Sequence, residues 1–214
     1  MKISIKLPSG FESQFKKNIT KELKKQVQNK APDAIVQIKS LLQSKIISIL
    51  TSSAEHNTII SSRVVRELGI QGIENRLMNV YQTIANNISV TFIKNSPELI
   101  QINIGILKSD YSDILGLQES TFLYSGSKGS GILNWLEWLL TKGGSPIVVG
   151  YSFVNRSGKG RLNQGFMKPS PNRSWSVPSE ASGTENDNFI TRALSKSVEK
   201  LSPSIEKIIQ GVYK

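Results

Sequence analysis

The sequence contains no cysteine and a single histidine, His56, among its 214 residues. Without cysteine, the chain can form neither a disulfide framework nor a thiolate metal site, and it has no cysteine nucleophile. With one histidine it cannot build a two-histidine zinc site, and we expect His56 to be a solvated helix residue. The acidic residues show no cluster typical of a metal nuclease. We therefore expect no metal, no cofactor and no enzymatic activity.

Long apolar runs are also missing. No uninterrupted stretch approaches the about 18 apolar residues that indicate a membrane-spanning helix, and the N-terminal sequence lacks the continuous apolar region of a secretory signal. We therefore expect no membrane partner. The 38% of hydrophobic residues nevertheless recur with clear periodicity along the chain, which predicts a folded protein.

Acidic residues are few, 16 against 27 lysines and arginines, and the formal net charge is +11. In residues 1–45 ten lysines face three acidic residues, which leaves +7, and in 155–214 ten basic residues face five acidic ones, which leaves +5. Such a balance is typical of proteins that contact nucleic acid, an acidic membrane face or an acidic protein partner. A lysine-rich genome would produce the same composition. The concentration of charge at the ends favours contacts made by peripheral elements.

The first 87 residues are predicted to be mostly helical, after a short strand over 1–7. Apolar residues recur every three or four positions, and Pro32 is expected to interrupt the pattern. Four helical stretches result, at 10–30, 35–52, 59–69 and 73–87.

The remaining residues, 88–214, alternate between strand and helix patterns. Two alternating runs joined by a short turn predict a hairpin over 88–107. Further expected elements are a short strand, a helix, three strands and an amphipathic helix, at 121–124, 132–140, 145–154, 161–168, 174–178 and 190–212. Pro203 lies inside the last pattern and predicts a kink or two abutting helices. Candidate caps for this helix are Thr184, Asn186 and Asp187.

The fold class is therefore α+β, with a helical N-terminal half, a central antiparallel sheet with packed helices, and a C-terminal amphipathic helix. A mainly helical region, 1–87, precedes an α+β domain, 88–214, or the two form one continuous domain. Within the second region, Trp135 and Trp138 are interpreted as core anchors of their helix. The run SGSKGSG, 125–131, lacks the spacing of a phosphate-binding loop and is expected to be a flexible surface loop.

The stretch 155–174 is glycine-rich and contains no acidic residue. Its basic side chains could neutralise nucleic-acid phosphates, which gives salt-dependent binding without sequence preference. It could instead be a hairpin whose tip docks into a partner subunit or lines a ring, or a plain solvated loop. The candidate interface or DNA-facing residues are Arg156, Lys159, Arg161, Lys168 and Arg173.

Four segments in this order are distinctive: LNWLEWLLTKGG, IVVGYSFV, NRSGKGRLNQGFM and SWSVPSEASGTENDNFITRAL. With the closing helix, they resemble virion structural proteins of tailed bacteriophages, in particular neck or tail-completion proteins at the head–tail junction. In that group a loop of the type SRSGxGxM precedes SWxVP…GTxxxNFITRAL. The loop is matched loosely and the second motif closely, and the likeness covers about residues 130–214.

The resemblance implies a non-enzymatic protein that forms a ring, six-fold in the common case, and joins neighbouring portal-adaptor, neck or tail proteins. Its implied location is the virion, assembled in the host cytoplasm, with non-specific contact to packaged DNA. The alternative function is a basic nucleic-acid-binding protein that contacts DNA through the N-terminal helix and 155–174.

In the virion interpretation, the second motif is a structural clasp. Trp175 and Pro178 brace the sheet, Gly183 belongs to the turn, and Phe189 seats the terminal helix. Arg192 lies near a helix start, where the helix dipole disfavours a cation, so we expect it to have a carboxylate or carbonyl partner.

Overall fold

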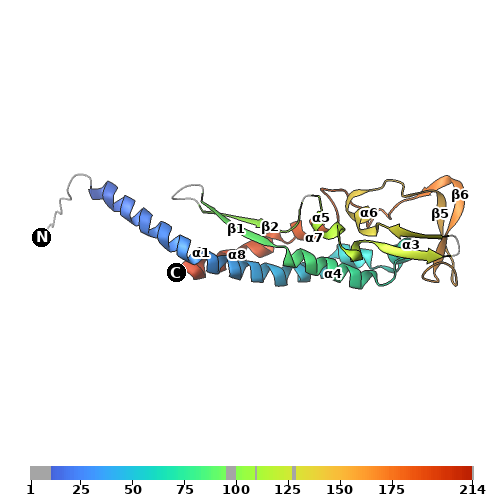
Figure 1. Ribbon diagram of the computed structural model, residues 1–214, viewed down its shortest axis with the longest axis horizontal. Helices are drawn as coiled ribbons and strands as arrows, with labels where there is room; N and C mark the ends of the chain where they lie inside the picture. The colour runs from blue at the N-terminus through green and yellow to red at the C-terminus, as the bar shows by residue number, and fades with distance from the viewer. Residues whose placement is uncertain (1–10, 95–99, 109, 127–128, 214) are drawn as a thin grey trace.

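The computed structural model describes residues 11–94, 100–108, 110–126 and 129–213. The strand expected at 1–7 and the turn expected at 95–97 lie outside these residues. The molecule is elongated: helices run along its length, and two of its hairpins lie at the end remote from the N-terminus (Figure 1). The α+β class is confirmed, and the described strands form three separate two-stranded antiparallel sheets rather than one central sheet.

The first helix, α1 (Phe11–Thr51), is continuous through Pro32, so the expected interruption there is wrong. A proline inside a helix removes one backbone hydrogen bond and tends to bend the helix rather than always ending it. Figure 1 shows that the N-terminal part of α1 stands clear of the body and runs in a different direction from the rest. The later part packs against α4 (Ile73–Asn86) and α8 (Val198–Tyr213).

The second half of α1 is apolar enough to resemble a membrane span. The segment Asn29–Thr51 meets this criterion by length and by a mean hydropathy of 1.2, a test that the core helix of a globular protein also passes. Here one face of the segment is buried against other helices. The buried residues recur every four positions and are Ala34, Ile38, Leu42, Ile46 and Leu50.

The third predicted helical stretch, 59–69, corresponds to α3 (Ser62–Leu68), and a short helix that was not predicted, α2 (Ala54–Ile59), precedes it. A serine precedes each helix, Ser53 before α2 and Ser61 before α3. Its side chain accepts a hydrogen bond from a backbone amide in the first turn of that helix. The left-handed backbone of Gly69, with φ of 64°, ends α3. The fourth stretch corresponds to α4, as predicted.

His56 is buried, contrary to the expectation of a solvated histidine: its exposed fraction is 5%. Its Nδ1 lies 3.1 Å from the hydroxyl oxygen of Tyr81, which is itself fully buried in α4. A buried tyrosine hydroxyl needs a hydrogen-bonding partner, and the short α2 helix supplies one. Burial lowers the pKa of His56, against an opposing effect of Glu74, and burial raises the pKa of Tyr81.

The first hairpin joins β1 (Ser89–Lys94) to β2 (Ile100–Gly105), as predicted. The second joins β3 (Phe122–Gly126) to β4 (Gly129–Leu133) and corrects the expectation of a flexible loop over 125–131. Tyr124 pairs with Gly131, where a Cβ would lie 2.7 Å from the tyrosine hydroxyl. The tyrosine ring therefore covers the glycine, an arrangement that stabilises a glycine-containing strand.

The third hairpin joins β5 (Val148–Asn155) to β6 (Gly165–Trp175). We predicted two separate strands here, at 161–168 and 174–178, whereas β6 is one strand that contains Pro169 and Pro171. A two-stranded sheet has two free edges, so a proline without an amide hydrogen can be accommodated there. The register shifts beside Gly150, whose φ is 78°: Tyr151 pairs with Pro169, and Val149 pairs with Ser174. The extra residues of β6 form a bulge.

Between the hairpins lie α5 (Ser112–Leu115), the short 3-10 helix η1 (Gln118–Ser120) and α6 (Trp135–Thr141). Trp135 is fully buried and donates a hydrogen bond from Nε1 to the carbonyl of Glu119, 2.8 Å away. It anchors α6 as predicted, although the helix begins three residues later than expected.

The C-terminal pattern forms two abutting helices, α7 (Phe189–Ser195) and α8, and the break lies at Lys196–Ser197 rather than at Pro203. Both helices contact α1, so the end of the chain packs beside its first helix. One buried cluster extends from Ile38 to Ala193 and contains residues of both predicted regions.

The buried pair of His56 and Tyr81 predicts that the protein loses stability in mild acid. In an unfolded chain a histidine is protonated at about pH 6.5, as in model peptides. Folded His56 has a lower pKa and is protonated only at a lower pH. As the pH falls through the unfolded-state value, the unfolded state binds more protons and the free energy of unfolding falls, by at most about 1.4 kcal/mol per pH unit. Denaturant unfolding at neutral pH and at mildly acidic pH measures the effect.

The matched variant is His56→Gln, which retains a polar side chain near Tyr81 but cannot titrate. We expect it to be less stable than the wild type at neutral pH and to lose less stability on acidification. An unchanged pH dependence in the variant would contradict this role for His56.

Candidate functional site

The predicted clasp is a closely packed turn between β6 and α7. Trp175 ends β6 with its ring buried edge-to-face against Trp138, the ring centroids 6.3 Å apart. Its Nε1 donates a hydrogen bond to Oε2 of Glu67, at 3.0 Å. Pro178 is buried and its carbonyl accepts hydrogen bonds from the amides of Ala181 and Ser182. The chain thus leaves the hairpin through a fixed turn.

Gly183 occupies a position where no side chain fits. A Cβ there would lie 2.5 Å from the carbonyl oxygen of Leu139 in α6 and 2.5 Å from Cβ of Asn188. The Gly183 carbonyl also accepts a hydrogen bond from the amide of Gly143, at 2.8 Å. Close approach of the backbone to α6, rather than an unusual φ, therefore requires glycine here.

The N-terminal cap of α7 is Asn188, which was not among the caps we expected. Its side chain accepts hydrogen bonds from the amides of Ile190 and Thr191, while the Thr191 hydroxyl accepts one from the Asn188 amide, which makes a capping box. Asn188 is fully buried, and its Nδ2 donates to the Tyr111 hydroxyl at 2.7 Å and to the Thr184 carbonyl at 3.0 Å. Local sequence could not identify Tyr111, which is 77 residues away.

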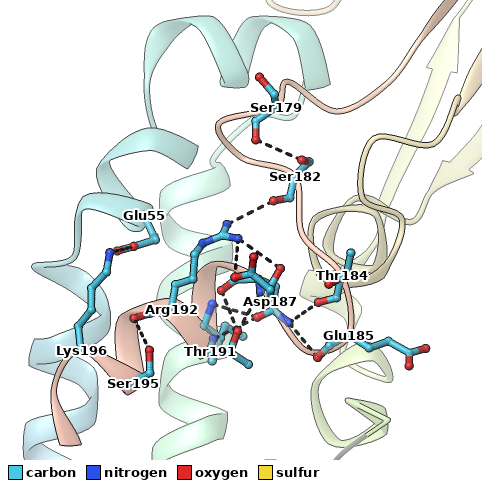
Figure 2. Close-up of polar contacts among 12 residues, drawn as sticks. Glu55, Ser179, Ser182, Thr184, Glu185, Asp187, Thr191, Arg192, Ser195 and Lys196 are labelled. Atoms are coloured by element: carbon cyan, nitrogen blue, oxygen red, sulfur yellow. Dashed lines mark hydrogen bonds and ion pairs between the residues drawn. The ribbon is translucent and has the colours of Figure 1, made fainter.

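Arg192 has the partners expected of it (Figure 2). Its Nη1 lies 3.1 Å from a carboxylate oxygen of Asp187 and also donates to the Asp187 carbonyl, and its Nη2 donates to the Ser182 carbonyl. The side chain therefore closes the turn on itself, and Phe189 beside it is buried in the core. Figure 2 also shows Lys196 extending to Glu55 of α2.

Glu55 is the second acidic partner in this region, and nothing in the local pattern pointed to it. Burial would raise the pKa of its carboxyl, but the hydrogen bond and charge of Lys196, with a smaller effect of Arg192, outweigh burial and lower it. Arg192 of α7 thus links the helix to the turn before it, and Lys196, the C-terminal cap of α7, links the helix to α2.

The basic residues of 155–174 lie on the β5–β6 hairpin, and they are not equivalent. Arg161 donates from Nε and Nη2 to the carbonyls of Gly69 and Leu68, at 2.9 Å each, and its guanidinium lies over the ring of Tyr124. It caps the C-terminal end of α3 and joins three elements, so it is a structural residue. Burial lowers its pKa, with Tyr124 opposing.

Arg161 is exposed overall despite these contacts, and the other four basic residues are exposed too: Arg156, Lys159, Lys168 and Arg173. The loop that carries the first two is closed by backbone hydrogen bonds, for example from the Gly165 amide to the Lys159 carbonyl at 2.9 Å. A Cβ on Gly160 would lie 1.6 Å from the Gly165 carbonyl oxygen. The hairpin therefore presents Arg156 and Lys159 on a compact tip, whereas Lys168 and Arg173 lie along β6.

The same end of the molecule exposes large apolar side chains, which the sequence analysis did not identify. Leu123 and Ile132 pair across the β3–β4 hairpin with exposed fractions of 69% and 61%. On β5, Val149 is 74% exposed and Tyr151 40%. Leu123 and Val149 each belong to an alternating strand pattern, but the pattern does not say which of its faces is covered.

No group of three or more histidine, cysteine, aspartate or glutamate side chains in the described part of the chain could hold a metal ion. The clasp uses its polar groups internally, whereas the two hairpins offer basic and apolar groups to a partner. The geometry therefore supports binding to macromolecules through the hairpins, positioned by the clasp.

Replacing Asn188 tests the clasp. In Asn188→Ala we expect the free energy of unfolding to fall by about 2 kcal/mol, because the cap is lost and buried partners are left without hydrogen bonds. Denaturant unfolding followed by circular dichroism measures this change. Asn186→Ala, at an exposed position of the same turn, is the control and should change stability little; equal effects would contradict the assignment.

A pair of glycine variants tests the close approach of the turn to α6. Gly183→Ala introduces a methyl group against backbone atoms, and we expect a loss of about 1–3 kcal/mol. Gly144→Ala meets no atom within 4 Å and should be neutral or slightly stabilising. Thermal unfolding of the two variants compares them; a neutral Gly183→Ala would show that the turn can move away.

Comparison with protein-family models, curated proteins and solved structures finds no match to this chain. The likeness to tailed-phage proteins therefore rests on the motif residues themselves. Within that motif, Trp175 ends β6, Pro178 and Gly183 lie in the turn that follows, and Phe189 and Arg192 lie in α7.

Proposed function

We propose that this protein is a structural component of a tailed-phage virion at the head–tail junction, which assembles with copies of itself into a ring and joins adjacent rings. Two kinds of support combine here: the motif over 173–194, and the exposed apolar pair Leu123 and Ile132 on β3–β4. The pair is the observation on which the assembly part of the proposal depends.

Exposed apolar side chains in register on a hairpin are unfavourable in water unless a partner covers them. A two-stranded sheet also leaves backbone hydrogen-bonding groups free along its edges, where a strand of another subunit can pair. A ring provides such a partner on each side of every subunit, because a head-to-tail contact repeats until the ring closes. Six-fold symmetry is an expectation of the resemblance.

The basic ends of the chain suit the same position. Acidic surfaces of neighbouring rings, or DNA that passes through the junction, would contact the four exposed basic residues of the β5–β6 hairpin. Those residues also favour the alternative, a nucleic-acid-binding protein that acts on its own. Salt dependence separates the two, since phosphate contacts weaken steeply as salt rises.

The first experiment is gel filtration with light scattering, at low and high salt, with and without duplex DNA. We expect the wild type to form a discrete oligomer that persists at high salt. The double variant Leu123→Thr with Ile132→Thr keeps strand-forming residues but removes apolar area, and it should shift the mass toward the monomer.

Val36→Thr is the control, because Val36 is an exposed apolar residue on α1, away from β3–β4. It should leave the oligomer unchanged. A monomer that binds duplex DNA tightly at low salt and releases it at high salt would overturn the proposal and favour the alternative.

A further inference from the structure

A cavity of about 220 Å³ lies between the C-terminal end of α3 and the β5–β6 hairpin. Its apolar walls include Phe153, Leu162 and Phe166, and two arginines, Arg66 and Arg161, also line it. Neither the clasp nor the exposed apolar pair on β3–β4 includes these wall residues. The cavity therefore has its own character, apolar with two cationic groups.

Arg66 has an unsatisfied donor in this setting: its Nε is buried and has no hydrogen-bond partner among the described residues. Nε itself is closed to a molecule the size of water, so a ligand in the cavity would meet the charged guanidinium of Arg66 at its Nη groups. Arg161 has already used two of its donors, since its Nε and Nη2 donate to backbone carbonyls at the end of α3.

The carboxylate of Glu67, which also borders the cavity, is engaged elsewhere. Its Oε1 accepts from Arg63 at 3.2 Å, and its Oε2 accepts from Trp175 at 3.0 Å. Arg63 also pairs with Glu180. The charge of Glu67 is thus directed to α3 and the clasp, and the cavity retains cationic groups facing apolar walls.

We propose that this cavity binds the carboxylate of an acidic side chain flanked by an apolar residue, presented by a partner protein. Arginine forms strong hydrogen bonds to carboxylates, and the charge of both partners strengthens them. Phe153, Leu162 and Phe166 would cover the neighbouring apolar residue. A cavity of this volume is smaller than the 300–1,000 Å³ or so of cofactor and drug sites and suits a side chain.

A nucleic-acid phosphate fits less well, because the apolar walls offer no donors to its remaining oxygens. The strand that supplies Phe153 continues outward to exposed Tyr151 and Val149, which extends the apolar surface beyond the cavity. A peptide can follow that surface. The inference does not depend on the virion function proposed above and would hold for any acidic protein partner.

The test uses the full-length protein labelled with ¹⁵N and follows the Nε–Hε resonance of Arg66. One probe is a capped pentapeptide with glutamate at its centre, between phenylalanine and leucine; the other is the same peptide with glutamine. We expect a saturable shift with the glutamate peptide and about tenfold weaker binding of the glutamine peptide, since one charge-assisted hydrogen bond contributes about that factor.

Arg66→Gln should abolish the difference between the two peptides. Arg173→Gln, on the exposed bulge of β6, is the charge-matched control and should retain it. The backbone resonances report whether each variant folds. Arg66→Lys keeps the charge but loses the planar guanidinium donors, and it should bind the glutamate peptide more weakly than the wild type.

Three results would overturn the proposal. Equal shifts with both peptides would mean that only the apolar walls bind. No shift with either peptide would mean that the cavity does not bind an acidic side chain. A larger response to inorganic phosphate or to duplex DNA than to the glutamate peptide would identify a phosphate site and support nucleic-acid binding.

Discussion

The buried side chain of Asn188 is the interaction on which the C-terminal half of the structure depends. One amide group caps α7 with its oxygen and holds Tyr111 and the preceding turn with its nitrogen. In the apolar interior each of these groups would be costly without a partner, so they order one another. Because α7 is fixed in this way, α8 begins where it can pack along α1.

The clasp also explains how the molecule divides its polar groups. Arg192 donates its hydrogen bonds within its own turn, whereas Arg161 and Trp175 donate theirs to segments far apart in sequence. The exposed apolar pair Leu123 and Ile132 and the exposed basic residues of 155–174 lie on the two hairpins at the end remote from the N-terminus (Figure 1). A scaffold whose own polar groups are satisfied can present such hairpins without distortion when a partner binds.

Elements with a strong local pattern could be predicted from the sequence, and α4, the β1–β2 hairpin and β5 are examples. The misplaced features depend on contacts that periodicity does not describe. His56 is buried beside Tyr81, 25 residues away, and within the 125–131 run Tyr124 covers Gly131 across a hairpin. At Pro32 the packing of the later part of α1 against α4 and α8 outweighs a local preference for a break.

The sequence by itself determined the α+β class, the helical N-terminal half and the need of Arg192 for a partner, because these follow from periodicity and from the helix dipole. Only the tertiary structure decided which of the basic residues of 155–174 are free. Arg161 and Arg156 have the same charge and lie in the same loop, but only Arg161 meets the carbonyls at the end of α3. Hydrogen bonds between distant segments depend on how the elements pack, which no local pattern contains.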